Sequence, residues 1–179
     1  MNEQPTGKNG PLEGLRVIDW TMWQFGPVST MMLADLGAEV IKVESLDGDH
    51  ARQFHRVSGA ASTLPGDLNA YFQSLNRQKM SLAVDLKTEK GKEIMYRLVE
   101  ESDVFVQNFR PGVVERLGIG ESDIRARSPN IVYVSISGFG EQLPGPLRVI
   151  SIFFLEACRP ILKRSNELQD IHSKQRGRI

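Results

Sequence analysis

The sequence predicts an α/β fold with a parallel β-sheet, and three observations lead to this class. Short runs rich in β-branched residues alternate with segments of helical periodicity, the links between them are mostly short, and Gly or Pro stands at several helix boundaries. Helices between consecutive strands supply the crossover connections that parallel pairing requires. The 179 residues are enough for one domain with a hydrophobic core of its own.

The first predicted unit is a strand, a helix and a second strand. Leu15–Trp20 is a short apolar run, and the helix that follows it opens at Gly26–Pro27. Proline suits the first helical turn because its missing N–H is not needed there, and Gly37 suits the left-handed position after the last turn. The strand Glu39–Glu44 follows almost at once, so we expect it to return beside the first strand.

The later elements follow the same alternation after an irregular stretch. Between Ser45 and Met80 only Leu68–Leu75 has the pattern of a helical turn or two. Thr88 is expected to cap a helix with one apolar stripe. The remaining elements are predicted as strands at 81–86, 103–106 and 130–137 and a short helix at 122–128.

Composition excludes several classes of function. The 22 basic and 22 acidic side chains balance, so no overall field favours nucleic acid or an anionic membrane. The single cysteine, Cys158, cannot form an internal disulfide, and no Cys/His cluster could hold a metal. The N-terminal residues 1–10 are polar and lack the apolar core of a signal peptide, and no later apolar run approaches the length of a membrane span. We therefore expect a cytoplasmic protein without a metal, a nucleic-acid partner or a membrane anchor.

Polar side chains gather near strand ends, where open parallel sheets bind ligands. Donors precede one strand at 76–79 and follow another at 108–116, and such a set suits a phosphate-rich ligand. Gly26 permits close backbone approach before a helix N-terminus, and Ser137–Gly140 forms a flexible turn with an aromatic ring. Each feature alone is equally consistent with a plain turn or a solvated charge. No GxGxxG, P-loop or GxSxG motif supports nicotinamide, nucleoside triphosphate or esterase chemistry.

Taken in order, six blocks of sequence resemble the start of the family III (CaiB/BaiF) CoA-transferases. The blocks lie between Pro11 and Pro146 and read PLEGLRVIDWTMWQFGP, LADLGAEVIKVES, GDHAR, LNRQKMSLAVDLKTEKGKE, SDVFVQNFRPGVVERLG and PNIVYVSISGFGEQ. The resemblance implies a Rossmann-like domain, CoA or acyl-CoA as substrate with no covalently bound cofactor, and an interlocked homodimer in full-length relatives. The division that follows is a disordered N-terminus at 1–10, a CoA-binding domain at 11–147 and a divergent tail at 148–179.

The resemblance also implies which residues meet the ligand. Those that would line the CoA site are Gln24, Phe25, Asn76, Arg77, Gln78, Lys79, Asn108, Phe109, Arg110, Arg116, Ser137, Gly138, Phe139 and Gly140. Arg116 would reach a phosphate, and Ser137–Gly140 would flank the thioester. Many relatives place an Arg where this sequence has Ser45, and Arg52 is expected to compensate for it.

The resemblance ends before the family's nucleophile. In the transferases a Gly-Tyr-Asp or Gly-His-Asp segment follows soon after the GFGxxGP turn, and its Asp attacks the thioester. Here the following residues 147–155 hold no carboxylate, and the tail is more basic than the body. We interpret the tail as a reading-frame artefact or a degraded gene, and the alternative is a natural amphipathic helix with a disordered basic end. We expect a truncated chain that keeps CoA binding at most, without a catalytic residue of either the transferase or the racemase branch. The alternatives are a CoA- or nucleotide-binding module that acts with a separate partner chain, and a non-functional gene fragment.

Overall fold

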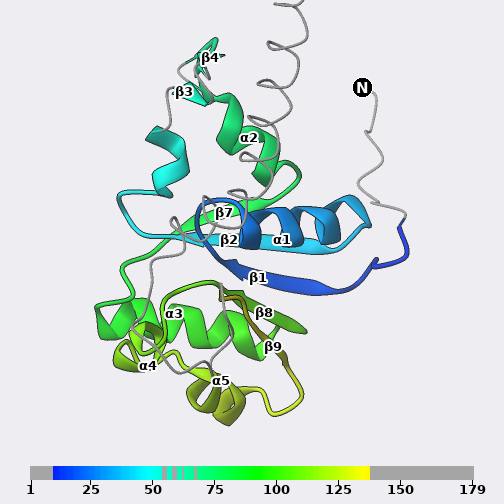
Figure 1. Ribbon diagram of the computed structural model, residues 1–179. Coiled ribbons are helices and arrows are strands. Elements are labelled where there is room, and N and C mark those ends of the chain that lie inside the picture. Colours follow the sequence, from blue (N-terminus) through cyan, green and yellow to red (C-terminus); the bar gives the residue numbers. More distant parts are fainter. Residues whose placement is uncertain (1–9, 54–55, 58–59, 62, 67, 138–179) are drawn as a thin grey trace, which may run out of the picture. The chain divides into compact units, whose positions relative to one another are not determined.

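A computed structural model describes residues 10–53, 56–57, 60–61, 63–66 and 68–137. Its centre is a five-stranded parallel sheet in the order β7-β2-β1-β8-β9, which is shown in Figure 1. The strands are β1 (Arg16–Trp20), β2 (Glu39–Glu44), β7 (Met80–Ala83), β8 (Val104–Gln107) and β9 (Val132–Ser135). Counted along the chain, this is the strand order of the Rossmann-type nucleotide-binding fold, so the predicted fold class is confirmed.

The sheet is organised around β1, which pairs with β2 on one side and with β8 on the other. Ile18 stands level with Ile41 of β2 and with Phe105 of β8. Both faces of β1 are covered, which explains why its sequence is a nearly unbroken apolar run. Asp19 is the exception, because it is a carboxylate with no solvent exposure.

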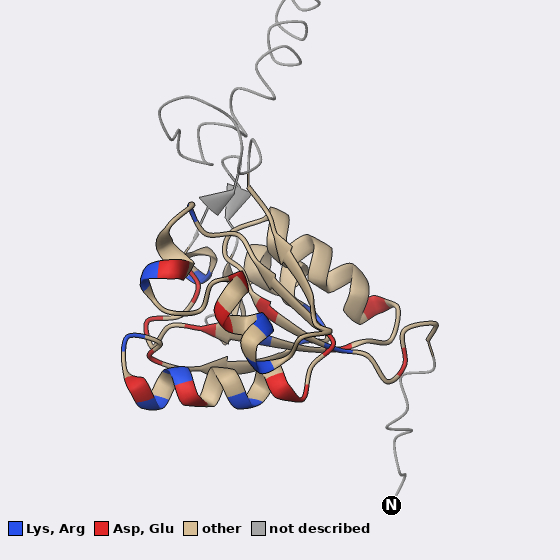
Figure 2. Cartoon of the chain, turned by 90° about the horizontal axis from the view of Figure 1, so that it is seen from below, with Lys and Arg blue, Asp and Glu red and all other residues tan. Residues whose placement is uncertain are grey.

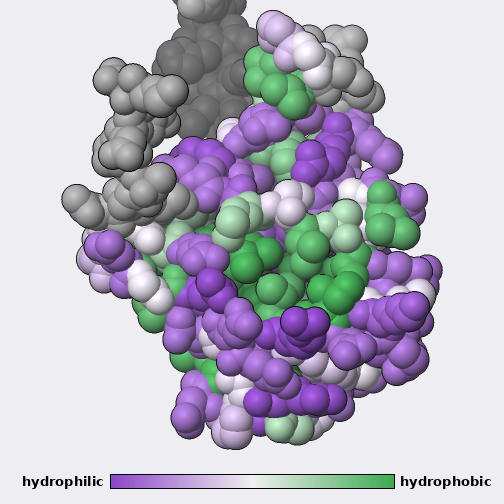
Figure 3. Space-filling model, turned by 180° about the vertical axis from the view of Figure 1, so that it is seen from behind, coloured by the Kyte–Doolittle hydropathy of each residue, from purple (hydrophilic) through white to green (hydrophobic). Residues whose placement is uncertain are grey.

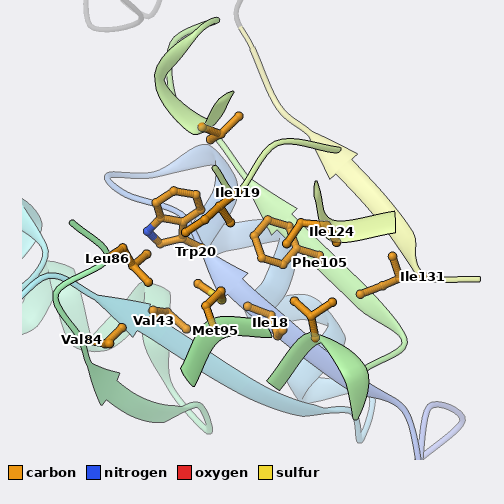
Figure 4. Close-up of a cluster of buried hydrophobic side chains, with 12 residues drawn as sticks. Ile18, Trp20, Val43, Val84, Leu86, Met95, Phe105, Ile119, Ile124 and Ile131 are labelled. Atoms are coloured by element: carbon orange, nitrogen blue, oxygen red, sulfur yellow. The ribbon is translucent and has the colours of Figure 1, made fainter. Parts of the chain in front are cut away.

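Helices cover the two faces of the sheet. On one face α1 (Phe25–Asp35) packs through Ala34 against Val17, Val40 and Val106. The other face carries α3 (Glu89–Glu100), α4 (Val113–Arg116) and α5 (Glu121–Arg127), whose apolar side chains meet those of Ile18 and Phe105 (Figure 4). Thr88 caps α3 as predicted, since its Oγ1 accepts a hydrogen bond from the N–H of Gly91 at 3.0 Å.

The stretch between β2 and β7 holds more structure than its sequence predicts. It contains a 3₁₀ helix, η1, two short antiparallel strand pairs and the helix α2. The bounds are η1 (His50–Gln53), β3 (Arg56–Val57), β4 (Ala60–Ala61), β5 (Thr63–Leu64), β6 (Leu68–Asn69) and α2 (Ala70–Asn76). The helical pattern predicted at 68–75 is therefore α2, which starts later because Asn69 caps it by accepting from the N–H of Phe72 at 2.9 Å.

Acidic and basic residues are interspersed along the described chain, as the coloured cartoon in Figure 2 shows. Apolar residues gather on the face shown in Figure 3. The sheet leaves some apolar area uncovered at the edge formed by β7, where Met80 is 48% exposed. In the part of the chain with assigned structure, no helix combines the length and the apolar character that crossing a bilayer requires.

Candidate functional site

The carboxyl ends of β1 and β8 form the point where the strand order reverses. The chain moves from β1 outward to β2 and β7, then returns to the other side of β1 as β8. At such a point the loops after two neighbouring strands diverge and leave a crevice in which ligands bind. Asn108, directly after β8, joins the two loops: its Oδ1 accepts from the N–H of Met22 at 2.8 Å, and its Nδ2 donates to the Met22 carbonyl at 2.7 Å.

The loop between β1 and α1 is held in one conformation by buried groups. The carboxylate of Asp19 accepts hydrogen bonds from the N–H of Thr21 at 3.1 Å and from its hydroxyl. Gly26 lies so close that a Cβ there would sit 2.7 Å from Thr21 Oγ1. Trp23 has a φ of 69°, a left-handed conformation that is rare for a bulky residue. Backbone strain of this kind persists only where the surroundings impose it.

A pocket of about 230 Å³ opens beside this loop, at the carboxyl ends of β1, β2 and β7. Its floor is apolar, and the rings of Trp20 and Phe109 lie 4.4 Å apart between centroids. Figure 4 shows Trp20, Val43, Val84 and Leu86 together at one end of the core cluster. The lining residues are Trp20, Thr21, Met22, Val43, Glu44, Ser45, Gly48, Asp49, Val84, Asp85, Leu86, Lys87, Phe109 and Leu117.

One cation, Lys87, lines this pocket, and two others, Arg110 and Arg116, are neighbours in sequence of the lining residues Phe109 and Leu117. The guanidinium groups of Arg110 and Arg116 are exposed, and neither has a hydrogen bond or ion pair to any residue in the described ranges. Gly112, at a φ of 81°, leaves room for Arg116, because a Cβ there would lie 3.0 Å from its Nη1.

Three carboxylates line the pocket: Asp85 accepts a hydrogen bond from the N–H of Lys87 at 3.0 Å, whereas those of Glu44 and Asp49 are paired with cations. Glu44 accepts from Nε and Nη2 of Arg52 at 2.8 and 2.7 Å. Burial by itself would raise the pKa of Glu44, but the hydrogen bonds from Arg52 and from the N–H of Asp49 outweigh it, so the pKa lies below its ordinary value of 4.5. Asp49 pairs with Lys42 at 3.0 Å, and both side chains are 1% exposed. Glu44 and Asp49 therefore do not repel an anionic ligand as free carboxylates would.

The structure gives most donors of the 76–79 segment a protein partner. The side chain of Lys79 is buried, and its Nζ donates to Asp19 Oδ2 at 2.7 Å, to Pro27 O at 2.8 Å and to Asn76 Oδ1 at 2.9 Å. Burial lowers its pKa, and Asp19 opposes that shift. The side chains of Arg77 and Gln78 both bind Asp35 of α1. Of the predicted ligand-binding residues that the structure describes, only Phe109 lines the pocket.

The other predicted residues have varied surroundings. Gln24 stands at the N-terminus of α1, half-buried, and its side-chain amide makes no hydrogen bond with residues of the described ranges. Phe25 follows it with 47% of its surface exposed. Ser137 is half-buried two residues after β9, while Gly138, Phe139 and Gly140 lie outside the described residues, as does the tail at 148–179. Arg52 is expected to replace an Arg that is missing at Ser45. In the structure it forms an ion pair with Glu44, and its Cζ lies 3.7 Å from the centroid of the Phe72 ring.

The sequence did not single out Lys87, Val84, Leu86 or Leu117. The available signal was that Asp85–Lys87 joins a predicted strand to the N-cap of a helix, which places it at the carboxyl edge of the sheet. Among residues with described positions, no group of His, Cys, Asp and Glu side chains has the geometry of a metal site.

Comparison with known proteins connects this site with a family. Residues 12–149 match the model of CoA-transferase family III. A probable fatty acyl-CoA transferase of Mycobacterium tuberculosis, Rv3272, is 46% identical over 136 residues, which are 75% of this chain and 33% of that protein. A formyl-CoA:oxalate CoA-transferase of Streptomyces avermitilis is 47% identical over 73% of this chain and 30% of its own length.

Solved structures agree with this relationship. The crystal structure of Rv3272 superposes with a TM-score of 0.67 at 44% identity, covering 75% of this chain and 36% of that one. A CaiB/BaiF family protein from Brucella suis gives a TM-score of 0.68 at 39% identity, covering 76% and 36%. The chain thus spans about a third of the length of the relatives it matches. On its sequence and on its fold, the chain belongs to CoA-transferase family III.

Proposed function

We propose that the pocket at the carboxyl ends of β1, β2 and β7 binds the nucleotide end of coenzyme A. The observation that carries the proposal is the combination of an apolar, aromatic floor with an exposed lysine, Lys87, in the pocket lining. A purine ring suits the space beside Phe109 and Trp20, because aromatic rings stack on bases in a sequence-independent way. Lys87 and Arg116 supply positive charge for phosphate groups.

The remaining predicted contacts follow from this placement. The pantetheine arm would leave the pocket along the crevice between β1 and β8, past the loop that carries Gln24 and Phe25. Gln24 has amide groups available for it, since they are not used within the described protein. The proposal that Ser137–Gly140 flanks the thioester rests on the family resemblance alone, since Gly138–Gly140 lie outside the described residues. Lys79, Asn76 and Asn108 would act through the backbone segments that they hold.

For a full-length family protein that contains this domain we propose the transfer of CoA from an acyl-CoA to a carboxylic acid, while this chain itself is proposed to keep CoA binding at most. This proposal rests on the family and on relatives named as acyl-CoA, formyl-CoA and succinyl-CoA transferases. We also propose a cytoplasmic location and, for the full-length form as in its relatives, a homodimer of two interlocked chains. Light scattering of the purified protein at several concentrations would test the dimer.

Isothermal titration with CoA, 3′-dephospho-CoA and ADP tests the binding proposal. We expect CoA to bind, and the variants Lys87→Met and Arg116→Gln each to weaken it by about tenfold, since a charge-assisted hydrogen bond contributes about 1.5–3 kcal/mol. Lys90→Met, an exposed lysine of α3 outside the pocket, is the matched control and should bind like the unmodified chain.

Two other outcomes would change the assignment. Equal affinity for ADP and CoA would favour a general nucleotide-binding module that acts with a partner chain. No binding of CoA to a chain that unfolds cooperatively would contradict the proposal and favour a fragment without this function.

A further inference from the structure

Lys42 of β2 is a buried cation that touches both loops beside the pocket without lining the pocket itself. Its Nζ donates to the carbonyl of Thr21 at 2.8 Å and lies 3.0 Å from Oδ2 of Asp49. Thr21 and Asp49 belong to the pocket lining, whereas Lys42 does not. A buried ammonium group is costly unless its charge is compensated and its protons are bonded, so these two contacts define where it can lie.

Each contact of Lys42 ends on a residue that is fixed within its own loop. Thr21 gives its N–H and its hydroxyl to Asp19. Asp49 donates its N–H to Oε2 of Glu44 and accepts from the N–H of Ala51, both at 2.9 Å. The Lys42 side chain therefore connects two hydrogen-bonded residues, which we call the anchors: Thr21 after β1 and Asp49 after β2.

The residues that follow Met22 and Asp49 in the chain contact each other through their rings. The ring of Trp23 stacks on that of His50, with centroids 5.8 Å apart and planes inclined by 29°. Trp23 follows Met22 and His50 follows Asp49, so both rings stand beside lining residues. Because Trp23 holds a left-handed backbone conformation, the loop needs outside support to keep this geometry.

We infer that Lys42 is a positioning residue, which sets the spacing of the two loops that flank the pocket and thereby its affinity for CoA. The inference rests on the proposed function for the identity of the ligand. Lys42 reaches no ligand itself, since its side chain is 1% exposed and its ammonium group donates to the carbonyl of Thr21 and lies 3.0 Å from Asp49 Oδ2 in an ion pair without hydrogen-bond geometry. A lysine that served stability alone would leave CoA affinity unchanged in any variant that still folds.

The test compares Lys42→Met with the double variant Lys42→Met/Asp49→Asn. The single variant leaves the carboxylate of Asp49 buried without its partner and is expected to unfold at a lower temperature. The double variant removes both charges together, so we expect it to recover most of that loss while still lacking the contact to Thr21. Ile124→Ala, in the core beneath α5 and outside the pocket lining, provides a destabilised control with intact loops.

Two measurements are made at a temperature where every variant is folded. The first is the dissociation constant for CoA, which we expect to rise about tenfold in the double variant and to stay unchanged in Ile124→Ala. The second is acrylamide quenching of Trp23, made in a Trp20→Phe background because the chain has two tryptophans. Quenching should increase when the loop loses Lys42 and should not change in Ile124→Ala.

The outcomes separate this inference from the proposed function. A folded double variant with normal CoA affinity and normal quenching of Trp23 would overturn the positioning role. If the unmodified chain binds no CoA, the proposed function fails, and the quenching measurement alone decides whether Lys42 holds the loops.

Discussion

The ammonium group of Lys79 lies 2.7 Å from a carboxylate oxygen of Asp19, and both side chains are almost completely excluded from solvent. Asp19 also accepts from the hydroxyl of Thr30 at 2.6 Å, while Lys79 donates to the carbonyl of Pro27 at 2.8 Å. This ion pair thus connects the end of β1 with the first turns of α1 and with the segment that leads into β7. Its energetic role is to neutralise two charges that the fold places in its interior.

Replacing Lys79 by Met should destabilise the fold strongly. The variant leaves Asp19 buried without its counter-charge, and we expect the free energy of unfolding to fall by about 3–5 kcal/mol. Urea denaturation followed by circular dichroism measures the loss. Lys90→Met, which removes an exposed lysine of α3, should change stability by less than about 0.5 kcal/mol. Equal stability of the two variants would show that Asp19 and Lys79 are not paired in solution.

The Glu44 carboxylate predicts a pH dependence in the acid range. Its pKa is lower in the folded chain than its ordinary value of 4.5, so it adds stability above that pH and loses this contribution as the pH falls through the folded value. Glu44→Gln should be less stable than the unmodified chain at pH 7, and the difference should shrink progressively below about pH 4.5. Denaturation midpoints at a series of pH values would show this convergence, and parallel curves would contradict it.

Gly112→Ala should lower both stability and CoA affinity, for two separable reasons. Gly112 has a φ of 81°, at which an alanine is strained by about 1 kcal/mol, and the added Cβ would press on Nη1 of Arg116. Gly14, with a φ of 87° and open space for at least 4 Å around the place a Cβ would take, is the matched site. Gly14→Ala should show the same backbone penalty with unchanged binding. Thermal melts and titration calorimetry of both variants distinguish strain from displacement of Arg116.

Gly26→Ala should be more damaging than either of these substitutions. Its Cβ would fall on the side chain of Thr21, which is buried and hydrogen-bonded to Asp19. Crowding of a packed interior costs about 1–3 kcal/mol, and here it would also displace a lining residue of the pocket. We expect a lower melting temperature together with weaker CoA binding. A variant that melts like the unmodified chain would show that the loop can move aside freely.

The sequence predicted the sheet well because its strands carry a clear signal. β1 and β2 are short runs rich in β-branched residues, and the helix between them is bounded by Pro27 and Gly37. Thr88 is a strong helix cap. The two-residue strands β3 to β6 were missed because such short hairpins have no periodicity to detect. The strand order could not be derived from spacing, since it depends on which side of β1 the chain returns to after α3.

The candidate site was less predictable than the fold. Lys79 and Arg77 look alike in sequence as donors beside a strand, yet one is buried against Asp19 and the other binds Asp35 at the surface. The difference depends on long-range contacts, which a local pattern does not contain. Lys87 was not predicted as a site residue because it stands among other charged residues before α3. Only its place in the pocket lining distinguishes it from them.

The bridge between Asn108 and Met22 also bears on the order in which the chain acquires its structure. The two residues are 86 positions apart, and β1 likewise pairs with β8 across most of the domain. During synthesis from the N-terminus, the β1–α1–β2 unit can form before β8, which pairs with the other edge of β1, has been synthesised. The crevice between β1 and β8 therefore cannot form before Asn108 has been synthesised, and the CoA binding that we propose would depend on this late part of the chain.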